Sequence, residues 1–286
     1  MSTESEVQIS YSVDNEFFAL WLDSEMNYTC ALFEDTKLWG DKLESAQRNK
    51  LSFLSRLAHI GPATSSVLDI GCGWGANLAY QATVNCVPEV HGFTLSSAQH
   101  RYCVERNIPN VIATCENYRG YEAPQAFDAV FCICMMEHIA RPEDARNGKH
   151  IELYRDFFRR VHSWTKPDTY MALQAITTNV IPRQKKDLED MRHANTVIFP
   201  GGLCPRVEDL VAAANPCYEV MEMYSRRLHY KRTAECWLER LQQNRKVIQD
   251  RWGKDLYSGY DRYLSFCVRA FENNFQSLHQ FSLRRR

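Results

Sequence analysis

A short glycine-rich run, Val67–Ala76, constrains the fold of this chain more than any other segment. The apolar residues before the first glycine predict a buried strand, and the Gly-x-Gly-x-Gly spacing that follows predicts a tight turn. Glycine is required where the backbone adopts a positive φ or passes close to a ligand. Asp69 lies at the carboxyl end of the predicted strand, where ligands bind in open α/β sheets. The run therefore predicts a parallel sheet with a ligand site at the end of one strand.

Two classes of protein place such a turn after a strand. Dinucleotide-binding dehydrogenases use Gly-x-Gly-x-x-Gly, but Ala76 stands here in place of the last glycine. With Asp69 two residues before the first glycine, the run resembles motif I of the S-adenosylmethionine (SAM) methyltransferases. We therefore favour a SAM site over a dinucleotide site.

Composition excludes several other classes. A chain of 286 residues that is 45% hydrophobic can bury an ordinary core, and a net charge of −1 does not suggest a nucleic-acid partner. The polar start of the chain is not a signal peptide, and no apolar run approaches the ~20 residues of a membrane span, so we expect no stable membrane insertion. The eleven cysteines show no metal-ligand spacing. We expect free thiols in a reducing cytoplasm, and no metal.

Strand and helix patterns alternate after the glycine run, which predicts a single α/β domain over residues 1–286. The predicted strands of the core are Val67–Ile70, Glu89–Phe93, Asn110–Thr114, Ala129–Cys134 and Tyr170–Ile176. We divide the chain into a helical N-terminal cover (1–60), a SAM-binding core (61–178), an irregular inserted cap (179–215) and C-terminal strands and helices (216–286). The cover contains an amphipathic helix over 43–60, and the last part contains a strand over 218–228, helices over 231–252 and 256–275, and a final edge strand over 277–283.

Polar residues after the second and third predicted strands suit the adenosine of SAM. Thr94, with Gln99 one turn later, follows the second strand, and Glu116 follows the third. Thr94 could instead cap a helix together with Ser96, and Glu116 could be an exposed carboxylate. The two roles of Thr94 are compatible.

Ordered matches along nearly the whole chain resemble the cyclopropane fatty acid synthase family, which includes the mycolic acid methyltransferases. The resemblance implies a Rossmann-like, seven-stranded class I SAM-methyltransferase sheet with a helical N-terminal cover. Besides the glycine run, the matching segments are Tyr11–Phe18, Asn27–Glu34, Leu43–Gln47, Gly92–Ser96 with Gln99, Met136–His138, Ile198–Gly202, His229–Tyr230 and Gln280–Leu283.

The resemblance also implies which residues bind SAM. Tyr28 and Thr29 would lie over its amino-acid end, and the turn would cradle it after Asp69. The remaining implied contacts are Gly71, Gly73, Ala76, Thr94, Leu95, Gln99, Glu116 and Ile133.

On the acceptor side, the family holds a bicarbonate that acts as base. Its ligands correspond here to Cys30, Glu137, His138 and Tyr230, but the histidine of the fifth strand is replaced by Gln174. Glutamine can hydrogen-bond a substrate but does not titrate. The replacement argues against a bound bicarbonate and against a lipid acceptor.

We predict that Glu137 is the carboxylate that stabilises a cationic intermediate or removes its proton, with Tyr230, His138 and Cys30 beside it. The acceptor would contact Tyr11, Phe17 and Gln174. Structural alternatives remain: Glu137 and His138 could cap a helix near Arg141, Tyr230 could be a core residue, and Cys30 could be only a buried thiol.

The predicted function is SAM-dependent C-methylation of an electron-rich carbon, in an indole-type ring, alkene or prenyl group of a small secondary metabolite. The alternatives are amine N-methylation, cyclopropane formation on a lipid, and a SAM-binding regulator without activity. The basic segment Arg183–Arg192, with Arg146 and Lys149, is either a solvated surface or a binding site for an acidic group of the substrate. The oligomeric state, a homodimer included, is left open.

Overall fold

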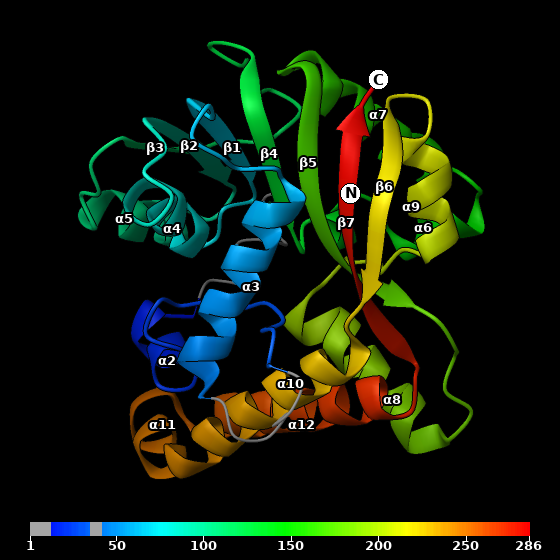
Figure 1. Ribbon diagram of the computed structural model, residues 1–286. Coiled ribbons are helices and arrows are strands. Elements are labelled where there is room, and N and C mark those ends of the chain that lie inside the picture. Colours follow the sequence, from blue (N-terminus) through cyan, green and yellow to red (C-terminus); the bar gives the residue numbers. More distant parts are fainter. Residues whose placement is uncertain (1–12, 35–41) are drawn as a thin grey trace.

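The computed structural model describes residues 13–34 and 42–286. Seven strands form one sheet in the order β3-β2-β1-β4-β5-β7-β6 (Figure 1). The strands from β1 to β5 run parallel, whereas β7 is antiparallel to both of its neighbours. Their bounds are β1 Ser66–Ile70, β2 Glu89–Thr94, β3 Val111–Cys115, β4 Phe127–Ile133, β5 Thr165–Thr178, β6 Tyr218–Ser225 and β7 Gln276–Arg285. The predicted α/β class and seven-stranded sheet are confirmed.

The prediction of a final edge strand is wrong. The last strand, β7, pairs with β5 on one side and with β6 on the other. Ser277–Leu283 are buried on both faces of the sheet, so the alternating pattern expected of an edge is absent. β6 forms the edge instead, and its burial does alternate toward its end.

Helices cover both faces of the sheet. One face packs against α3 (Leu43–Leu57), α4 (Ala76–Thr83) and α5 (Ser97–Glu105), and their buried residues form one apolar cluster with β1, β2 and β4. The opposite face packs against α7 (His150–Ser163) and α9 (Val207–Ala214), with the short α6 (Pro142–Arg146) nearby (Figure 1). The sheet is therefore buried on both sides, as a parallel sheet requires.

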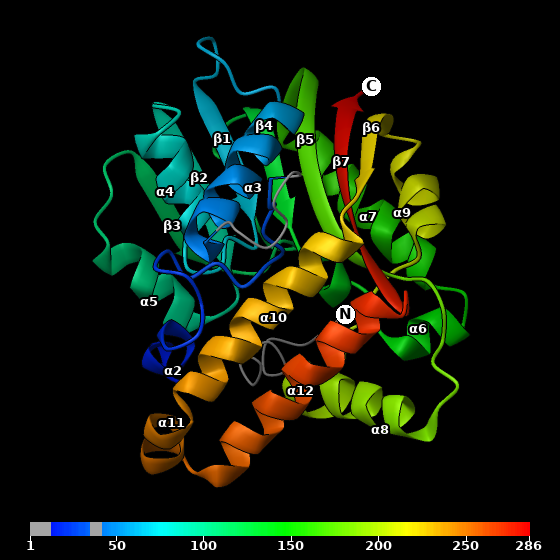
Figure 2. The ribbon, with the colours of Figure 1, turned by 60° about the horizontal axis from the view of Figure 1, so that its bottom comes forward.

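A second helical layer lies below the carboxyl ends of β1, β2 and β4. The helices α10 (Arg227–Gln243) and α12 (Lys254–Glu272) lie side by side, with α11 (Arg245–Trp252) joining them (Figure 2). α8 (Lys185–His193) and the π-helix η3 (Ala194–Ile198) pack against α12. This layer stands opposite the ligand edge of the sheet and closes the space below it.

The inserted segment 179–215 is not irregular, contrary to the prediction, since it contains α8, η3 and α9. Two buried acids explain α8: Asp187 and Asp190 pair with Arg269 on α12, and Asp190 also pairs with Arg262. These partners lie about 80 residues away, so a local pattern cannot reveal them. The strand predicted over 218–228 also ends early, because α10 begins at Arg227.

The N-terminal cover begins with α2 (Asn15–Ala19), which Asp14 caps through the amide of Glu16. Phe17 is fully buried and packs edge-on against Phe18, Trp21 and Tyr260. The predicted contact of Phe17 with the substrate is therefore wrong, because its ring belongs to the core. The other predicted contact in this region, Tyr11, lies outside the described residues.

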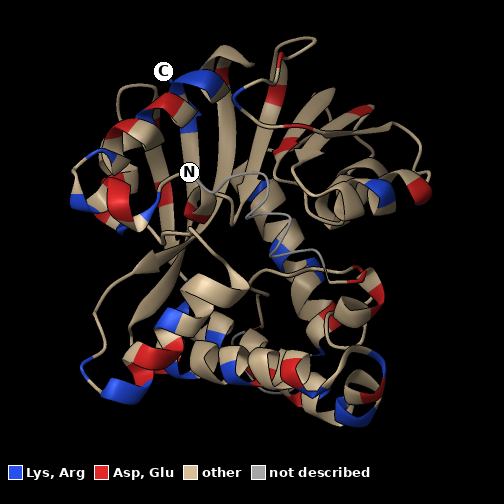
Figure 3. Cartoon of the chain, turned by 180° about the vertical axis from the view of Figure 1, so that it is seen from behind, with Lys and Arg blue, Asp and Glu red and all other residues tan. Residues whose placement is uncertain are grey.

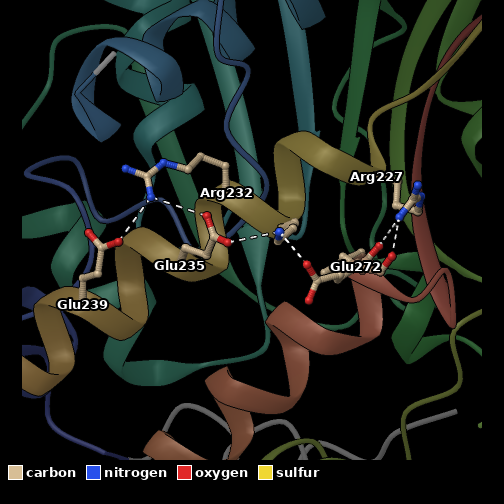
Figure 4. A network of polar contacts seen from close by, with 7 residues as sticks. Arg227, Arg232, Glu235, Glu239 and Glu272 are labelled. Atoms are coloured by element: carbon tan, nitrogen blue, oxygen red, sulfur yellow. Dashed lines mark hydrogen bonds and ion pairs between the residues drawn. The ribbon is translucent and has the colours of Figure 1, made fainter. Parts of the chain in front are cut away.

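Charged side chains are spread over the helices, with both signs interspersed (Figure 3). A ladder of ion pairs runs along α10, where Lys231 bridges Glu235 and Glu272, and Arg232 bridges Glu235 and Glu239 (Figure 4). This ladder ties α10 to α12 near the surface. In the described part of the chain, no helix is both long and apolar enough to cross a bilayer.

Candidate active site

One cavity of about 240 Å³ opens between the carboxyl ends of β1, β2 and β4 and the lower helical layer. Every residue predicted to bind SAM contributes to its wall: Tyr28, Thr29, Asp69, Gly71, Gly73, Ala76, Thr94, Leu95, Gln99, Glu116 and Ile133. These residues come from five separate segments of the chain. The parallel sheet brings most of them together because its strand ends meet at one edge, whereas Tyr28 and Thr29 come from the N-terminal cover.

The glycine turn after β1 forms the floor of this part of the cavity. Gly71 has φ 75°, and a Cβ atom there would lie 3.0 Å from Cγ of Met135. Gly73 has φ 56° with no atom within 4 Å of its Cβ position, so the space above it is open to a ligand. The amides of Gly71 and Cys72 both donate to the carbonyl of Phe93, which fixes the turn against β2.

Polar side chains stand around the turn. Asp69 accepts a hydrogen bond from Asn77 at 3.2 Å, and burial raises the pKa of its carboxyl to about 7. Thr94 donates to Oε1 of Gln99 at 2.8 Å, and Ser96 caps α5 through the amide of Gln99. The helix cap is therefore confirmed for Ser96, while Thr94 and Gln99 line the cavity where the SAM contact is predicted. Such a group of buried polar atoms suits the polar ends of a nucleoside ligand.

Sequence reasoning missed Lys50, which lies on the wall of the cavity. Its Nζ donates to Oδ1 of Asn27 at 2.8 Å and to Oγ1 of Thr29 at 3.1 Å, and burial lowers its pKa to about 8. A signal was present: Lys50 stands four residues after Ala46 and four before Leu54, on the apolar stripe of its helix. A lysine on that stripe needs a buried partner.

The other half of the cavity holds Glu137, His138 and Tyr230. Glu137 and His138 lie in a single 3₁₀ turn, η2 (Met136–His138), after β4. Oε1 of Glu137 accepts from the amide of Ile176 at 2.6 Å, and burial raises the pKa of the carboxyl to about 7. Burial lowers the pKa of His138 to about 4, so its ring is neutral at neutral pH.

The rest of this half of the cavity is mainly apolar and aromatic, with the amides of Asn195 and Gln276 also on the wall. The ring of Tyr230 stacks on Phe271 with centroids 4.3 Å apart. Further wall residues are Phe199, Cys204, Tyr263, Phe266 and Cys267. Phe199 and Cys204 follow η3, and the others lie on α12. Phe199 falls in the matching segment Ile198–Gly202, but no motif pointed to the rest. Within the described ranges, Lys50 is the one lysine or arginine on the cavity wall, and it stands in the first half.

Besides Phe17, two predicted residues do not reach the cavity. The thiol of Cys30 is buried, donates to the carbonyl of Ala31 and has a raised pKa, so it matches the alternative of a buried thiol. Gln174 is fully buried between β4 and β7, where Gln280 donates to its carbonyl oxygen. The predicted catalytic role of Cys30 and substrate contact of Gln174 are therefore wrong.

The structure also decides two alternatives. Glu137 does not cap the helix near Arg141, because Asp144 accepts the hydrogen bond from the Arg141 amide. The basic segment Arg183–Arg192, together with Arg146 and Lys149, contributes nothing to the described cavity wall, so it does not bind an acidic substrate group in this cavity. Among residues 13–34 and 42–286, no group of three or more His, Cys, Asp or Glu is placed to hold a metal.

The cavity thus has two connected halves, one polar and built on a glycine turn, the other apolar with a buried carboxylate. A seven-stranded sheet with β7 inserted antiparallel and this turn after β1 define a class I SAM-dependent methyltransferase.

Comparisons with known proteins identify the family. The model of the family described as mycolic acid cyclopropane synthetase matches residues 1–281. The S-adenosylmethionine-dependent methyltransferase UmaA of Mycobacterium tuberculosis is 30% identical over 97% of this chain and 96% of its own. The solved cyclopropane synthase MmaA2 of the same species superposes with a TM-score of 0.89 at 26% identity, covering 99% of this chain and 98% of its own. The mycolic acid cyclopropane synthase CmaA1, solved with SAH and CTAB, gives a TM-score of 0.88 at 25% identity, with the same coverage.

The chain therefore belongs to the mycolic acid cyclopropane synthetase family, as its motifs indicated. It is a SAM-dependent methyltransferase.

Proposed function

We propose that this enzyme transfers the methyl group of SAM to a carbon–carbon double bond in an apolar acyl chain and closes a cyclopropane by loss of a proton. This differs from the main prediction made from the sequence, in which the acceptor was a small secondary metabolite. The relatives named above as cyclopropane synthases support an acyl-chain alkene. So does the wall of the acceptor half, which is aromatic and has no described lysine or arginine to bind a charged group.

The observation that carries the proposal is the buried carboxylate of Glu137 on that wall. An alkene that receives a methyl cation becomes a carbocation, and the loss of a proton from the new methyl group closes the ring. Burial raises the pKa of Glu137 to about 7, and a base with a pKa near the working pH is the most effective. The carboxylate therefore suits both tasks, stabilising the cation and accepting the proton.

The residues of the first half fit SAM, since they combine an open glycine turn with polar groups at its rim. When bound, SAM supplies an electrophilic methyl group on a sulfonium. The chain itself holds the two reactants in line and excludes water, which supplies most of the rate. The faces of Tyr230, Phe199 and Tyr263 carry negative quadrupole charge, so they stabilise a cation that forms between them.

The set of residues that the family resemblance implied for a bicarbonate is incomplete here, although Glu137, His138 and Tyr230 line the cavity. Of the residues that the family resemblance implied as ligands, Cys30 is turned to Ala31, and Gln174 stands in place of the histidine and is hydrogen-bonded within the sheet. Neither contributes to the cavity wall. We therefore assign the proton transfer to Glu137 without an added anion.

A second candidate, C-methylation of an indole-type ring, alkene or prenyl group in a small metabolite, has one observation in its favour. The Gln174 replacement removes a titratable group that the lipid-modifying family keeps, while the aromatic wall also suits a flat ring.

The test is methyl transfer from isotopically labelled SAM to a panel of acceptors, with and without bicarbonate. The panel contains vesicles of a monounsaturated phospholipid, the same lipid with saturated chains, an indole, a prenyl compound and an amine. We expect label only in the unsaturated acyl chain, as a cyclopropane, and no activation by bicarbonate. Label only in the indole or prenyl compound would establish the second candidate, and label only in the amine would contradict both.

A further inference from the structure

The basic segment that does not reach the cavity lies on an outward surface of the lower helical layer. We call residues 179–198 the α8 segment. It begins where β5 ends, continues through α8 and η3, and packs along α12 (Figure 2). Its exposed side chains form an aliphatic group at each end and a basic group between them.

The aliphatic side chains of the α8 segment are unusually exposed. Val180 and Ile181 are 51% and 63% exposed, and Ile181 is the most exposed large apolar residue in the described part of the chain. No other two exposed large apolar residues among those described are adjacent in sequence. Val197, on η3, is 54% exposed. A single exposed aliphatic residue is ordinary, whereas such a group on one segment indicates an interaction surface.

The exposed charges of the α8 segment are mainly positive. Its exposed basic residues are Arg183, Lys185, Lys186 and Arg192. Glu189 is the one exposed acid, and it forms a 3.8 Å ion pair with Lys185 that contributes little in solvent. Asp187 and Asp190 do not offset the positive charge, because both are buried and pair with arginines of α12.

Hydrogen bonds fix the α8 segment at both ends. The amides of Asn179 and Val180 donate to the carbonyl of Phe275 at 2.9 and 3.4 Å. Near the other end, the ring of His193 hydrogen-bonds the carbonyl of Gly259 on α12 at 3.1 Å. The aliphatic and basic groups are therefore preorganised, which reduces the conformational entropy lost when a partner binds.

Both ends of the α8 segment border the acceptor half of the cavity. Asn195, within η3, is the one exposed residue on the described cavity wall. At the other end, Phe275 directly precedes Gln276, which is also on the wall. The acceptor half therefore reaches solvent beside the aliphatic and basic surface, so a chain that enters there passes from that surface into the cavity.

We propose that the α8 segment rests on a bilayer that contains anionic phospholipid, and that the acyl chain enters the cavity from this bilayer. Val180 and Ile181 insert among the acyl chains, and the four basic residues contact lipid phosphates. The inference rests on the proposed function, in which an acyl chain is the acceptor. It adds the source of that chain and the surface through which it arrives.

The chemistry of the surface fits a bilayer in two ways. A bilayer presents apolar chains directly below a layer of phosphates, and here an aliphatic pair stands two residues before a basic group. Each Lys or Arg near an anionic membrane strengthens binding about fivefold. Inserted apolar area adds to this attraction. Neither contribution requires the shape complementarity of a protein interface.

The test measures binding of the full chain to vesicles by sedimentation, in the absence of SAM. The vesicles contain monounsaturated phosphatidylcholine alone or mixed with phosphatidylglycerol of the same chains. We expect binding to the mixed vesicles only, and weaker binding as salt is added. Lys185→Gln/Lys186→Gln should weaken it about tenfold to thirtyfold, and Val180→Ser/Ile181→Ser about tenfold or more. Calorimetry should find SAH affinity unchanged in both variants, which shows that they are folded.

Matched control variants remove the same groups elsewhere. Lys246→Gln/Lys254→Gln removes two exposed lysines beside the other end of the lower helical layer, around α11 (Figure 2). Val84→Ser/Val104→Ser removes two valines that are 58% and 56% exposed, one after α4 and one on α5. Both should bind the mixed vesicles like the wild type, because neither net charge nor total apolar surface is the cause.

Kinetics give a second measurement. In methyl transfer from labelled SAM, the two variants of the α8 segment should raise KM for mixed vesicles and leave kcat unchanged. With a dispersed, short-chain monounsaturated acyl ester as acceptor, they should react like the wild type, since no surface has to be bound.

Three results would overturn the inference: no binding of the wild type to mixed vesicles, equal losses in the segment and control variants, or a loss confined to the lysine variant. It would also fail if the segment variants slowed methylation of an acyl chain on an acidic protein but kept vesicle binding, since the partner would then be a protein. Vesicle binding that falls as expected in an enzyme which methylates no unsaturated acyl chain would keep the docking surface and reject the proposed acceptor.

Discussion

At the scale of single residues, the chemistry depends on the balance between burial and hydrogen bonding at Glu137. Burial disfavours the carboxylate, whereas the Ile176 amide and the Cys134 thiol favour it, and the net effect raises the pKa to about 7. The wild-type rate should therefore increase with pH through about 7 as the base ionises. Asp69 is shifted in the same direction by burial, but it stands in the polar half of the cavity, away from the aromatic wall.

The variant Glu137→Gln tests this residue directly. Glutamine can still accept from the Ile176 amide but cannot take a proton, so turnover should fall by about a hundredfold or more while SAH affinity stays within about twofold. Rates with labelled SAM and calorimetry with SAH measure the two quantities. Unchanged turnover would reduce Glu137 to a structural residue.

The same variant has a stability signature with a defined sign. The folded pKa of about 7 lies above the ordinary value of 4.5, so the folded state binds more protons between these pH values and its free energy of unfolding falls as pH rises through them. The Glu137→Gln variant has no carboxyl group to titrate at this position, so its free energy of unfolding does not fall over this pH range. At pH 8 it should be more stable than the wild type by about 1–3 kcal/mol, and at pH 4 the two should be alike.

At the scale of elements, the segment Met26–Thr29 is held over the cavity by α3. Lys50 on that helix donates to Asn27 and Thr29, and Asn27 in turn donates to Asp23 at 2.9 Å. The amide of Gln47 on the same helix also donates to the carbonyl of Thr29. A buried lysine is destabilised by desolvation, so these contacts have to compensate for it.

Lys50→Met should release this segment and weaken the binding of SAM and SAH about tenfold, because the two hydrogen bonds that the charged Lys50 ammonium donates are lost. Isothermal calorimetry measures the affinity. Lys246→Met is the matched control, since Lys246 is exposed and, among the described residues, pairs only with Asp250 on its own helix. This variant should bind SAM and SAH like the wild type. Equal affinity in the Lys50→Met variant would show that α3 has no part in holding the donor.

At the scale of the whole molecule, a sheet supplies one half of the cavity and a helical layer the other. Three apolar clusters reflect this plan: two on the faces of the sheet, and a third, rich in aromatic rings, that joins the N-terminal cover to α10 and α12. The third cluster contributes Tyr230, Phe199 and Tyr263 to the acceptor half of the cavity. Low local polarity strengthens every electrostatic interaction that acts on a cation there.

The sequence predicted the sheet half well, for a physical reason. The strands Val67–Ile70 and Glu89–Phe93 are short segments next to the turn residues Gly71 and Pro88, and the structure places them within one residue of the predicted bounds. The carboxyl ends of parallel strands meet at one edge, so short motifs after each strand were sufficient to assemble the polar half of the cavity.

The helical half could not be predicted in this way. Phe199, Tyr263 and Phe271 enter the cavity only because α8, η3 and α12 pack together, which depends on ion pairs between distant segments. Phe17 lies in a segment that matches the family, and Gln174 stands where the family has a histidine, but neither fact says whether a side chain faces a cavity or the core. The last strand was predicted to lie at the edge of the sheet. Its interior position becomes clear only when β6 is known to pair with its outer side.

The most direct test of the central claim uses SAM with a fully deuterated methyl group and a monounsaturated acyl acceptor. If the transferred methyl loses a proton to Glu137 and closes the ring, mass spectrometry will find two of its three deuterium atoms in the product and no remaining double bond. A product that keeps all three deuterium atoms, whether on the acyl chain or on any other acceptor, would contradict the account.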